Sequence, residues 1–126
     1  IVLFQCPASF TPTKEHIADM RAFFHLVERD GLLFAWEPRG EWEDKQINGL
    51  CQELDLAHGL DPFQRPPLYG KIAYFRLHGM GGYRYRYTDQ DLSRLLRWCR
   101  EYEKAYCLFN NISMFEDALR MKEMLR

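Results

Sequence analysis

The chain has 126 residues and a mass of 15.1 kDa, which suffices for one domain and is too short for two well-packed ones. Hydrophobic residues make up 47% of the chain and charged residues 28%, so the composition predicts a packed core and excludes a disordered chain. The formal net charge of -1 excludes a global basic field that would attract nucleic acid or an anionic membrane.

No apolar run is long enough to cross a bilayer, and the amino terminus lacks the order of a signal peptide. The four cysteines have neither C-x-x-C spacing nor a nearby His in zinc-finger register. We therefore expect reduced core thiols in a cytoplasmic protein that does not engage membranes. The chain opens directly on residues 1–4, which resemble a buried strand, and we expect it to be cut from a longer protein.

Short apolar runs alternate with stretches of helical period along the chain, a pattern typical of repeated β/α units. Strands are predicted at residues 1–5, 32–37, 71–78 and 104–110, with a weaker one at 59–63. Helices are predicted to begin after Thr11 and Pro12, near Ile47, and in capping boxes at Thr88 and Ser113, with Gly31 closing the first helix. Such a series fits either a small doubly wound sheet or part of a (β/α)8 barrel.

Polar side chains finish every predicted strand: Gln5, Glu37, Arg39, Asp61, Arg76, His78, Asn110 and Asn111. In parallel β/α folds, the carboxyl ends of the strands lie on one face, where ligands and catalytic groups collect. Strand period places Arg76 and His78 on one side of the sheet and Phe75 and Leu77 on the other, apolar side. We therefore expect the polar set to converge.

Glu37 is the natural partner of Arg76, because an unpaired guanidinium in a desolvated site costs several kcal/mol. That pair alone fits a structural role as well as a functional one. The complete set of eight side chains resembles a site more than a scaffold. Asn111 is assigned to the turn that ends the strand, which leaves Asn110 as the better binding candidate.

Several motifs together resemble one protein family. They are LFQCP at residues 3–7, WEPRG at 36–40 with Trp42, LDPF at 60–63, YFRLHG at 74–79, YRYTD at 85–89 and FNN at 109–111. In this order and spacing they resemble the DUF72 (YecE-like) family, in its archaeal branch, over the whole chain. The resemblance implies a TIM barrel without an agreed activity. Residues 1–126 would form a single domain corresponding to the second half of that barrel, strands 4 to 8.

The sequence departs from the family pattern in two ways. Many relatives carry a His where this chain has Gly40, so a role resting on that imidazole is in doubt here. The first half of the barrel is absent, and half a barrel leaves open strand edges and apolar surface. We expect either part of a longer protein or an assembly, including self-association, in which another half completes the barrel.

These residues predict an enzyme-like site that binds an anionic ligand, a phosphate- or carboxylate-bearing small molecule or a phosphodiester; whether it is catalytic stays open. The candidate catalytic residues are Glu37, Arg76 and His78, and the candidate ligand-binding residues are Gln5, Arg39, Trp42, Asp61, Tyr87 and Asn110. Glu37, Asp61 and His78 suit Zn²⁺ or Mn²⁺, but nearby arginines already neutralise the carboxylates, so we expect no metal and no cofactor. His16, His25 and His58 are assigned to helices or loops.

The alternative function is a non-catalytic module for nucleic acid or nucleotides. Residues 83–87 alternate Tyr and Arg, and in extended form they would place three rings on one face and two guanidiniums on the other. We favour a solvated loop for this segment, and turn geometry over an anion cradle for the glycines at 79–82. A third hypothesis is that the polar set is a structural network only.

Overall fold

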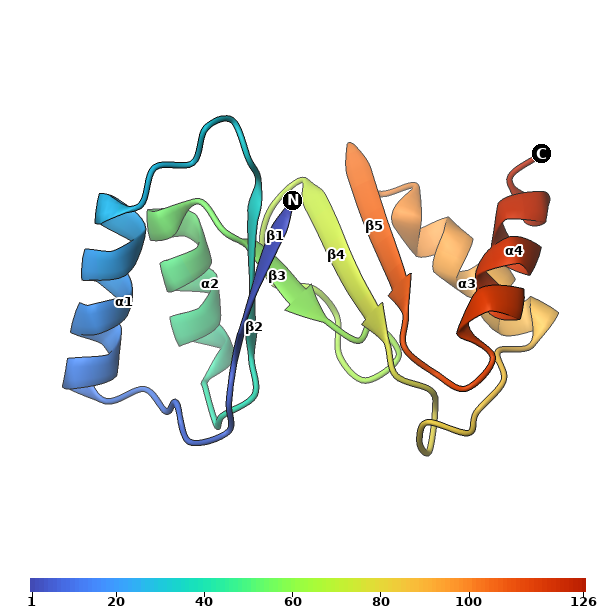
Figure 1. Ribbon diagram of the computed structural model, residues 1–126, viewed down its shortest axis with the longest axis horizontal. Coiled ribbons are helices and arrows are strands. Elements are labelled where there is room, and N and C mark those ends of the chain that lie inside the picture. Colours follow the sequence, from blue (N-terminus) through green and yellow to red (C-terminus); the bar gives the residue numbers. More distant parts are fainter. The chain divides into compact units, whose positions relative to one another are not determined.

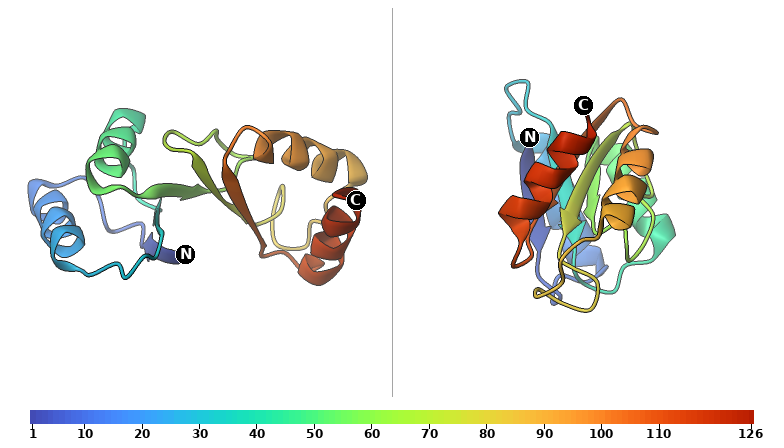
Figure 2. Two further views of the ribbon diagram at one scale, coloured as in Figure 1. Left: turned by 90° about the horizontal axis from the view of Figure 1, so that it is seen from above. Right: turned by 90° about the vertical axis from the view of Figure 1, so that its right-hand side faces the viewer.

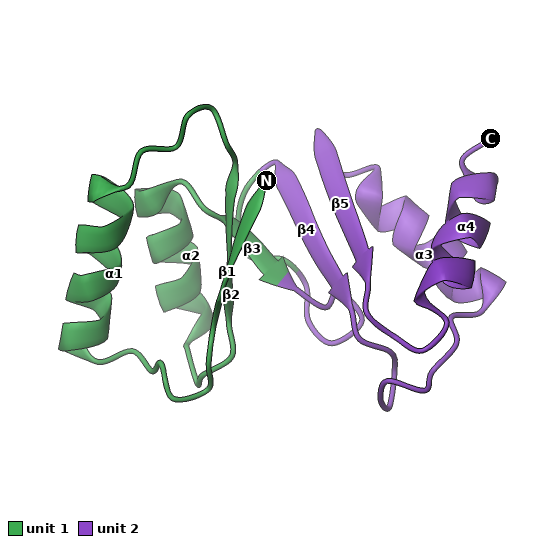
Figure 3. Ribbon diagram, viewed as in Figure 1, with its two compact units in different colours: residues 1–59, 67–70 green, residues 60–66, 71–126 purple.

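The computed structural model describes all 126 residues and divides into two compact units (Figure 3). Unit 1 comprises residues 1–59 and 67–70, and unit 2 comprises residues 60–66 and 71–126. The chain forms five strands and four helices, and a helix follows every strand except β3, which leads directly to β4, in the order that the hydrophobic pattern predicts (Figure 1). None of the helices is long and apolar enough to span a membrane. The grouping of both units into one domain stays a prediction.

Unit 1 is built on the parallel strands β1 (Val2–Cys6), β2 (Phe34–Pro38) and β3 (Ala57–Leu60), the last residue of which is assigned to unit 2. Helices α1 (Lys14–Leu26) and α2 (Asp44–Leu54) lie on one face of these strands (Figures 1 and 2). Phe34 and Trp36 point toward the helices and form the core with Phe24, Ile47 and Leu54. The alternate residue Glu37 therefore points to the opposite face of β2.

Unit 2 contains the parallel strands β4 (Ile72–Leu77) and β5 (Lys104–Phe109), which pair from Ile72↔Lys104 to Leu77↔Phe109. Helices α3 (Asp89–Cys99) and α4 (Met114–Met124) cover one face of this pair (Figures 1 and 2). Phe75 and Leu77 are fully buried in the core with Leu92, Leu95 and Met121. The predicted apolar side of β4 is confirmed.

The helix starts agree with the sequence only in part. Thr88 caps α3 as predicted, because its hydroxyl accepts the Asp91 N–H at 3.1 Å. The prediction for α1 is wrong: Thr13 is the cap, and its hydroxyl accepts the N–H of His16 at 3.1 Å. Ser113 precedes α4 but its side chain makes no capping hydrogen bond. The segment before α1 offers Ser9, Thr11 and Thr13 as possible caps, and the path of the chain selects among them.

Three further expectations are corrected. Helix α1 ends at Leu26, so Gly31 lies in the loop that follows, with a φ of +77°. The weakly predicted third strand at 59–63 runs instead over Ala57–Leu60, which leaves Asp61 just beyond the strand. His58 is a strand residue, not a loop residue, and its buried ring Nδ1 accepts the Leu68 N–H at 3.3 Å. Alanine, histidine and glycine have weak strand preference, so tertiary packing decides this element.

Candidate functional site

The carboxyl end of β2 carries an ion pair between a buried acid and an accessible base. Arg39 Nη2 lies 3.1 Å from Glu37 Oε1, and Arg39 Nε donates to the same oxygen at 3.2 Å. The Glu37 side chain is 8% exposed, whereas that of Arg39 is 41% exposed. Residues two apart at a strand end share a face, which explains the pairing. The buried Glu37 carboxylate thus binds the Arg39 guanidinium, and the Arg39 side chain remains partly exposed to solvent.

Gln5 lies beside this pair on the neighbouring strand. Parallel pairing of β1 with β2 places Gln5 opposite Glu37, and in-register residues of paired strands point to the same face. Gln5 is exposed. Unit 1 therefore brings three of the predicted residues, Gln5, Glu37 and Arg39, to one strand end.

Trp42 fixes the loop that follows Arg39 instead of lining open space. Its indole N–H donates to the carbonyl oxygen of Phe10 at 2.7 Å, and its ring stacks on the Phe10 ring at 5.9 Å. The indole is 7% exposed. A Cβ on Gly40 would lie 2.6 Å from that same Phe10 oxygen, so the close packing of the two loops requires glycine. The ligand-binding role predicted for Trp42 stays a prediction, and the observed contacts make it a loop anchor.

In unit 2, Asp61 fixes the backbone at the end of β4. Its Oδ1 accepts the N–H of Phe63 at 3.0 Å, and its Oδ2 accepts the N–H of His78 at 3.1 Å. Asp61 is 8% exposed. The carboxylate therefore ties the loop after β3 to the residue that directly follows β4.

His78 and Asn110 lie together at the ends of the two paired strands of unit 2. Asn110 Nδ2 is 3.3 Å from His78 Nδ1, and the Asn110 N–H donates to the Leu77 carbonyl at 2.9 Å. The Asn110 amide can donate to Nδ1 in the neutral tautomer that carries its ring proton on Nε2. His78 is half-buried and Asn110 is exposed. The predicted proximity of these two residues is observed.

A tight turn follows His78, as expected for the glycines at 79–82. Gly79 has a φ of +93°, and a Cβ there would lie 2.3 Å from the carbonyl oxygen of Gly82. The N–H of Gly79 donates to the Tyr87 hydroxyl at 2.8 Å. Tyr87 is 1% exposed, and burial raises the pKa of its phenol. Tyr87 therefore stabilises the turn by accepting the Gly79 N–H, and its predicted contact with a ligand stays a prediction.

Sequence reasoning missed the polar network under this loop. Asp117 on α4 is fully buried and accepts from the Tyr87 N–H at 3.1 Å, from Asn111 Nδ2 at 2.8 Å and from Arg120 Nη1 at 2.9 Å. Asn111 also donates to the Tyr85 carbonyl at 2.8 Å, which agrees with its assignment to a structural role. An acidic residue on the apolar face of a helix, with Arg three residues later, was the available signal.

The Tyr and Arg residues at 83–87 do not form the extended segment that a stacking surface needs. Tyr83 and Arg84 lie in a turn, so the alternation of faces is lost. The Tyr85 hydroxyl donates to Asp91 Oδ2 at 2.6 Å, and the Tyr87 hydroxyl is bound to Gly79. Only Tyr83 of the three rings is exposed. The arginines are solvated, as favoured from the sequence.

Each unit thus carries its own cluster of predicted residues. Unit 1 holds Gln5, Glu37 and Arg39, and unit 2 holds Asp61, His78 and Asn110, with Arg76 half-buried on β4. The expected pairing of Glu37 with Arg76 joins residues of different units and stays a prediction. No group of three or more His, Cys, Asp and Glu side chains that could hold a metal ion is present.

Comparison with models of protein families gives a match over the full length of the chain. The model of the family described as "Protein of unknown function DUF72" matches residues 1–126. The chain belongs to the DUF72 family. No curated protein sequence matches it significantly. The resemblance of its strand-end motifs to that family is therefore confirmed.

Two solved structures of DUF72 proteins resemble this DUF72 chain. One, from Enterococcus faecalis V583, has a TM-score of 0.75 and 24% sequence identity, and the match covers 98% of this chain and 57% of that protein. The other, from Thermotoga maritima MSB8, has a TM-score of 0.70 and 20% identity, with 98% and 56% covered. The chain thus spans a little over half the length of these proteins. Its parallel strands and helices form an α/β fold, as predicted for half of a (β/α)8 barrel.

Proposed function

We propose that the strand-end residues of this DUF72 protein form an enzyme-like site for an anionic ligand that carries a phosphate or carboxylate group. The observation that carries the proposal is the Glu37–Arg39 pair, in which a buried carboxylate holds a guanidinium that remains 41% exposed. A guanidinium fixed in orientation loses less entropy on binding and offers paired N–H donors to planar anions. Arg39 is therefore the first contact for the ligand.

The cluster in unit 2 supplies the other roles. Asn110 orients the His78 ring through Nδ1, and this leaves Nε2 as the group that gives or takes a proton. Asp61 fixes the His78 backbone, while Tyr87 supports the adjacent turn through the N–H of Gly79. A positioned imidazole at a strand end suits acid or base chemistry on a bound ester or acid.

The remaining predicted residues complete the proposal. Arg76 is the second cation of the anion clamp, Glu37 orients the arginines or acts as a base, and Gln5 and Asn110 donate hydrogen bonds to the ligand. Trp42 keeps the loop after Arg39 in place. No observation favours the nucleic-acid alternative, since two of the three tyrosine hydroxyls at 83–87 are bonded within the chain.

Thermal unfolding of the protein in the presence of inorganic phosphate, nucleotides, sugar acids and divalent metals tests this proposal. A ligand that binds the folded state raises the melting temperature by mass action. We expect phosphate- or carboxylate-bearing compounds to raise it more than sodium chloride at equal ionic strength. We expect this rise to be lost in Arg39→Gln and Arg76→Gln and to be reduced in His78→Gln.

Arg97→Gln is the matched control, because Arg97 is an exposed arginine in the last turn of α3. It should keep the full ligand-induced rise. The melting temperature of each variant without ligand separates lost binding from lost stability. An equal rise in the wild type and in Arg39→Gln would contradict the proposal, and lower melting of both arginine variants with no response in the wild type would favour a purely structural network.

We also infer that the protein is cytoplasmic. We infer in addition that a second barrel half, from another chain segment or another copy, covers the apolar side chains that this chain exposes. All four cysteines are free, which suits a reducing compartment. Large apolar side chains are exposed on α1 and α4: Leu26 is 82% exposed and Phe115 69% exposed. Light scattering on the purified protein tests self-association, and the mass of a single copy would exclude it.

A further inference from the structure

Two of the four cysteines in the chain are in contact, and the site proposed above uses neither. Cys99 is the last residue of α3, and Cys107 lies in the middle of β5. Their Sγ atoms are 3.4 Å apart and share a hydrogen bond. Strand alternation turns Cys107, like Ala105 and Phe109, toward the helices. The turn between α3 and β5 thus brings the two thiols together.

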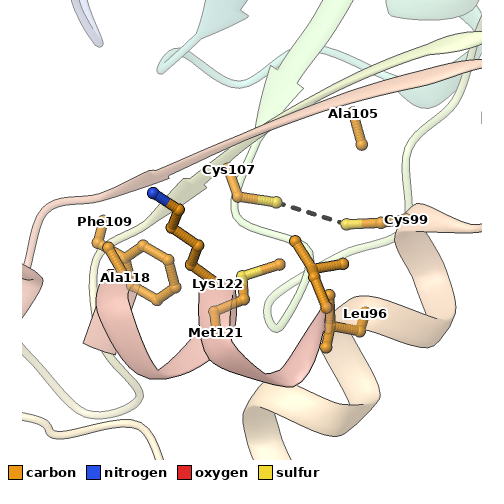
Figure 4. A pocket seen from close by; sticks show the side chains of 9 residues that line it. Leu96, Cys99, Ala105, Cys107, Phe109, Ala118, Met121 and Lys122 are labelled. Atoms are coloured by element: carbon orange, nitrogen blue, oxygen red, sulfur yellow. Dashed lines mark hydrogen bonds between the residues drawn. The ribbon is translucent and has the colours of Figure 1, made fainter. Parts of the chain in front are cut away.

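The two thiols also face a pocket. The pocket measures about 290 Å³ and lies between α3, β5 and α4 (Figure 4). Apolar side chains such as Leu96, Phe109 and Met121 line it, and Lys122 is its only charged lining residue. Both cysteines are half-buried. The pocket therefore offers a small solute a route to the two sulfur atoms.

The two sulfur atoms differ in reactivity because of their mutual hydrogen bond. Donation from the Cys107 thiol stabilises the Cys99 thiolate and lowers the pKa of Cys99, while the same contact and burial raise the pKa of Cys107. Thiolates, not thiols, attack peroxides and disulfides. We take Cys99 as the nucleophile of the pair and Cys107 as the sulfur that resolves its oxidised form, an assignment that the variants below test.

We propose that Cys99 and Cys107 form an oxidisable dithiol site that a small hydroperoxide entering the adjoining pocket converts into a reversible disulfide. The Cys99 thiolate attacks the terminal oxygen of the peroxide, the O–O bond breaks, and Cys99 becomes a sulfenic acid. The leaving alkoxide or hydroxide takes up the proton that the Cys99 thiol lost on ionising and departs as alcohol or water. The Cys107 sulfur then attacks the Cys99 sulfur, the S–O bond breaks, and the hydroxyl group leaves as water with the Cys107 proton. Overall, two thiols lose two electrons and two protons, and the peroxide is reduced.

The other two cysteines provide internal comparisons. Cys51 is fully buried, and burial raises the pKa of its thiol to about 12, so it should resist oxidation. Cys6 is a half-buried free cysteine on β1 in unit 1. Within that unit it makes no hydrogen bond with a second thiol. Only the 99–107 pair combines a thiol partner with a pocket.

Peptide mapping of the oxidised protein tests the proposal. The protein is treated with stoichiometric hydrogen peroxide, its remaining thiols are blocked with an alkylating agent, and it is digested with trypsin without reductant. Cleavage after Arg97, Arg100, Lys104 and Arg120 releases Cys99 in residues 98–100 and Cys107 in residues 105–120. We expect these two peptides joined by a disulfide, at the sum of their masses less two hydrogen atoms, and separated again by dithiothreitol.

Variants assign the two roles. In Cys107→Ala, Cys99 should stop at the sulfenic acid, which dimedone traps, and in Cys99→Ala, Cys107 should remain a free thiol. Cys51→Ala should leave the linked peptides unchanged. The wild-type map does not depend on whether a variant folds. Alkylation of both Cys99 and Cys107 after peroxide treatment, or a disulfide that instead contains Cys6, would overturn the proposal.

Discussion

The backbone N–H of Gly79 donates to the hydroxyl of Tyr87 at 2.8 Å, which ties the residue after His78 to a ring that is 1% exposed. Asp61 binds the N–H of His78 itself at 3.1 Å, so two consecutive backbone groups are held by side chains from different segments. Fixed backbone at a strand end limits the positions that the His78 ring can take. Asp61 and Tyr87 therefore position His78 by binding the backbone N–H groups of residues 78 and 79.

Replacing Tyr87 with Phe should lower the free energy of unfolding by about 1 to 3 kcal/mol, because the buried Gly79 N–H loses its acceptor. The ring remains, so packing against Phe63 and Phe109 is kept. Urea denaturation measures the loss. Tyr83→Phe is the matched control, since Tyr83 is 56% exposed and should change stability little. Equal effects of the two substitutions would show that the Gly79 contact does not stabilise the protein.

The order of strands and helices was predictable because the spacing of apolar residues along the chain distinguishes strands from helices. Phe75 and Leu77 are buried and Thr88 caps α3, as the pattern indicates. The weak third strand was displaced, because its residues have little strand preference and only packing defines it. The hydrophobic pattern predicts which elements form, whereas the bounds of a short strand such as Ala57–Leu60 depend on its packing in the folded protein.

The residues of the candidate site stay a prediction, and several of the contacts that they make could not be predicted from the sequence. The ion pair of Glu37 with Arg39, two residues away on the same face, was not predicted, whereas the predicted pair of Glu37 with Arg76 on β4 stays a prediction. The ligand-binding role of Trp42 stays a prediction, and the hydrogen bond from its indole N–H to the Phe10 carbonyl was not predicted. Such side chain to backbone bonds join distant loops and leave no periodic signal in the sequence.

Two glycines should respond oppositely to alanine. In Gly40→Ala, the new Cβ would lie 2.6 Å from the Phe10 carbonyl oxygen, so the loops must separate, at a cost of about 1 to 3 kcal/mol. In Gly49→Ala, on the exposed side of α2, no atom lies within 4 Å, and helix propensity should raise stability by about 0.5 to 1 kcal/mol. Thermal unfolding measures both changes. A stable Gly40→Ala protein would contradict the close loop packing.

Replacing Asp117 with Asn should lower the free energy of unfolding by about 3 kcal/mol, because it removes a buried carboxylate that is paired with Arg120. The amide of Asn also places a donor near the Asn111 amide or the Tyr87 N–H, which both donate to Asp117 now. Glu116→Gln removes an equal charge from the neighbouring, exposed position of α4 and should have little effect. Urea denaturation of both variants makes the comparison, and equal losses would argue against the network.

Tyr85→Phe should reveal a contribution to stability that depends on pH at both ends of the scale. The Tyr85 hydroxyl donates to Asp91 Oδ2 at 2.6 Å, and the Thr88 N–H donates to the same oxygen at 2.9 Å. Burial raises the pKa of Asp91, but these hydrogen bonds outweigh it and leave the pKa below its usual value. The hydrogen bond to Asp91 raises the pKa of Tyr85 to about 12. At neutral pH the bond should stabilise the protein by about 1 kcal/mol.

The sign at each end follows from these two shifts. Because the Asp91 pKa is lowered by folding, its contribution is complete above the unfolded value near 3.8 and is lost as the pH falls through the folded value. Because the Tyr85 pKa is raised, its contribution is complete below the unfolded value near 10 and is lost as the pH rises toward about 12. The difference in unfolding free energy between the wild type and Tyr85→Phe should therefore be greatest between these limits and shrink on both sides. A difference that is constant from acid to alkaline pH would mean that Tyr85 stabilises the protein through its ring and not through Asp91.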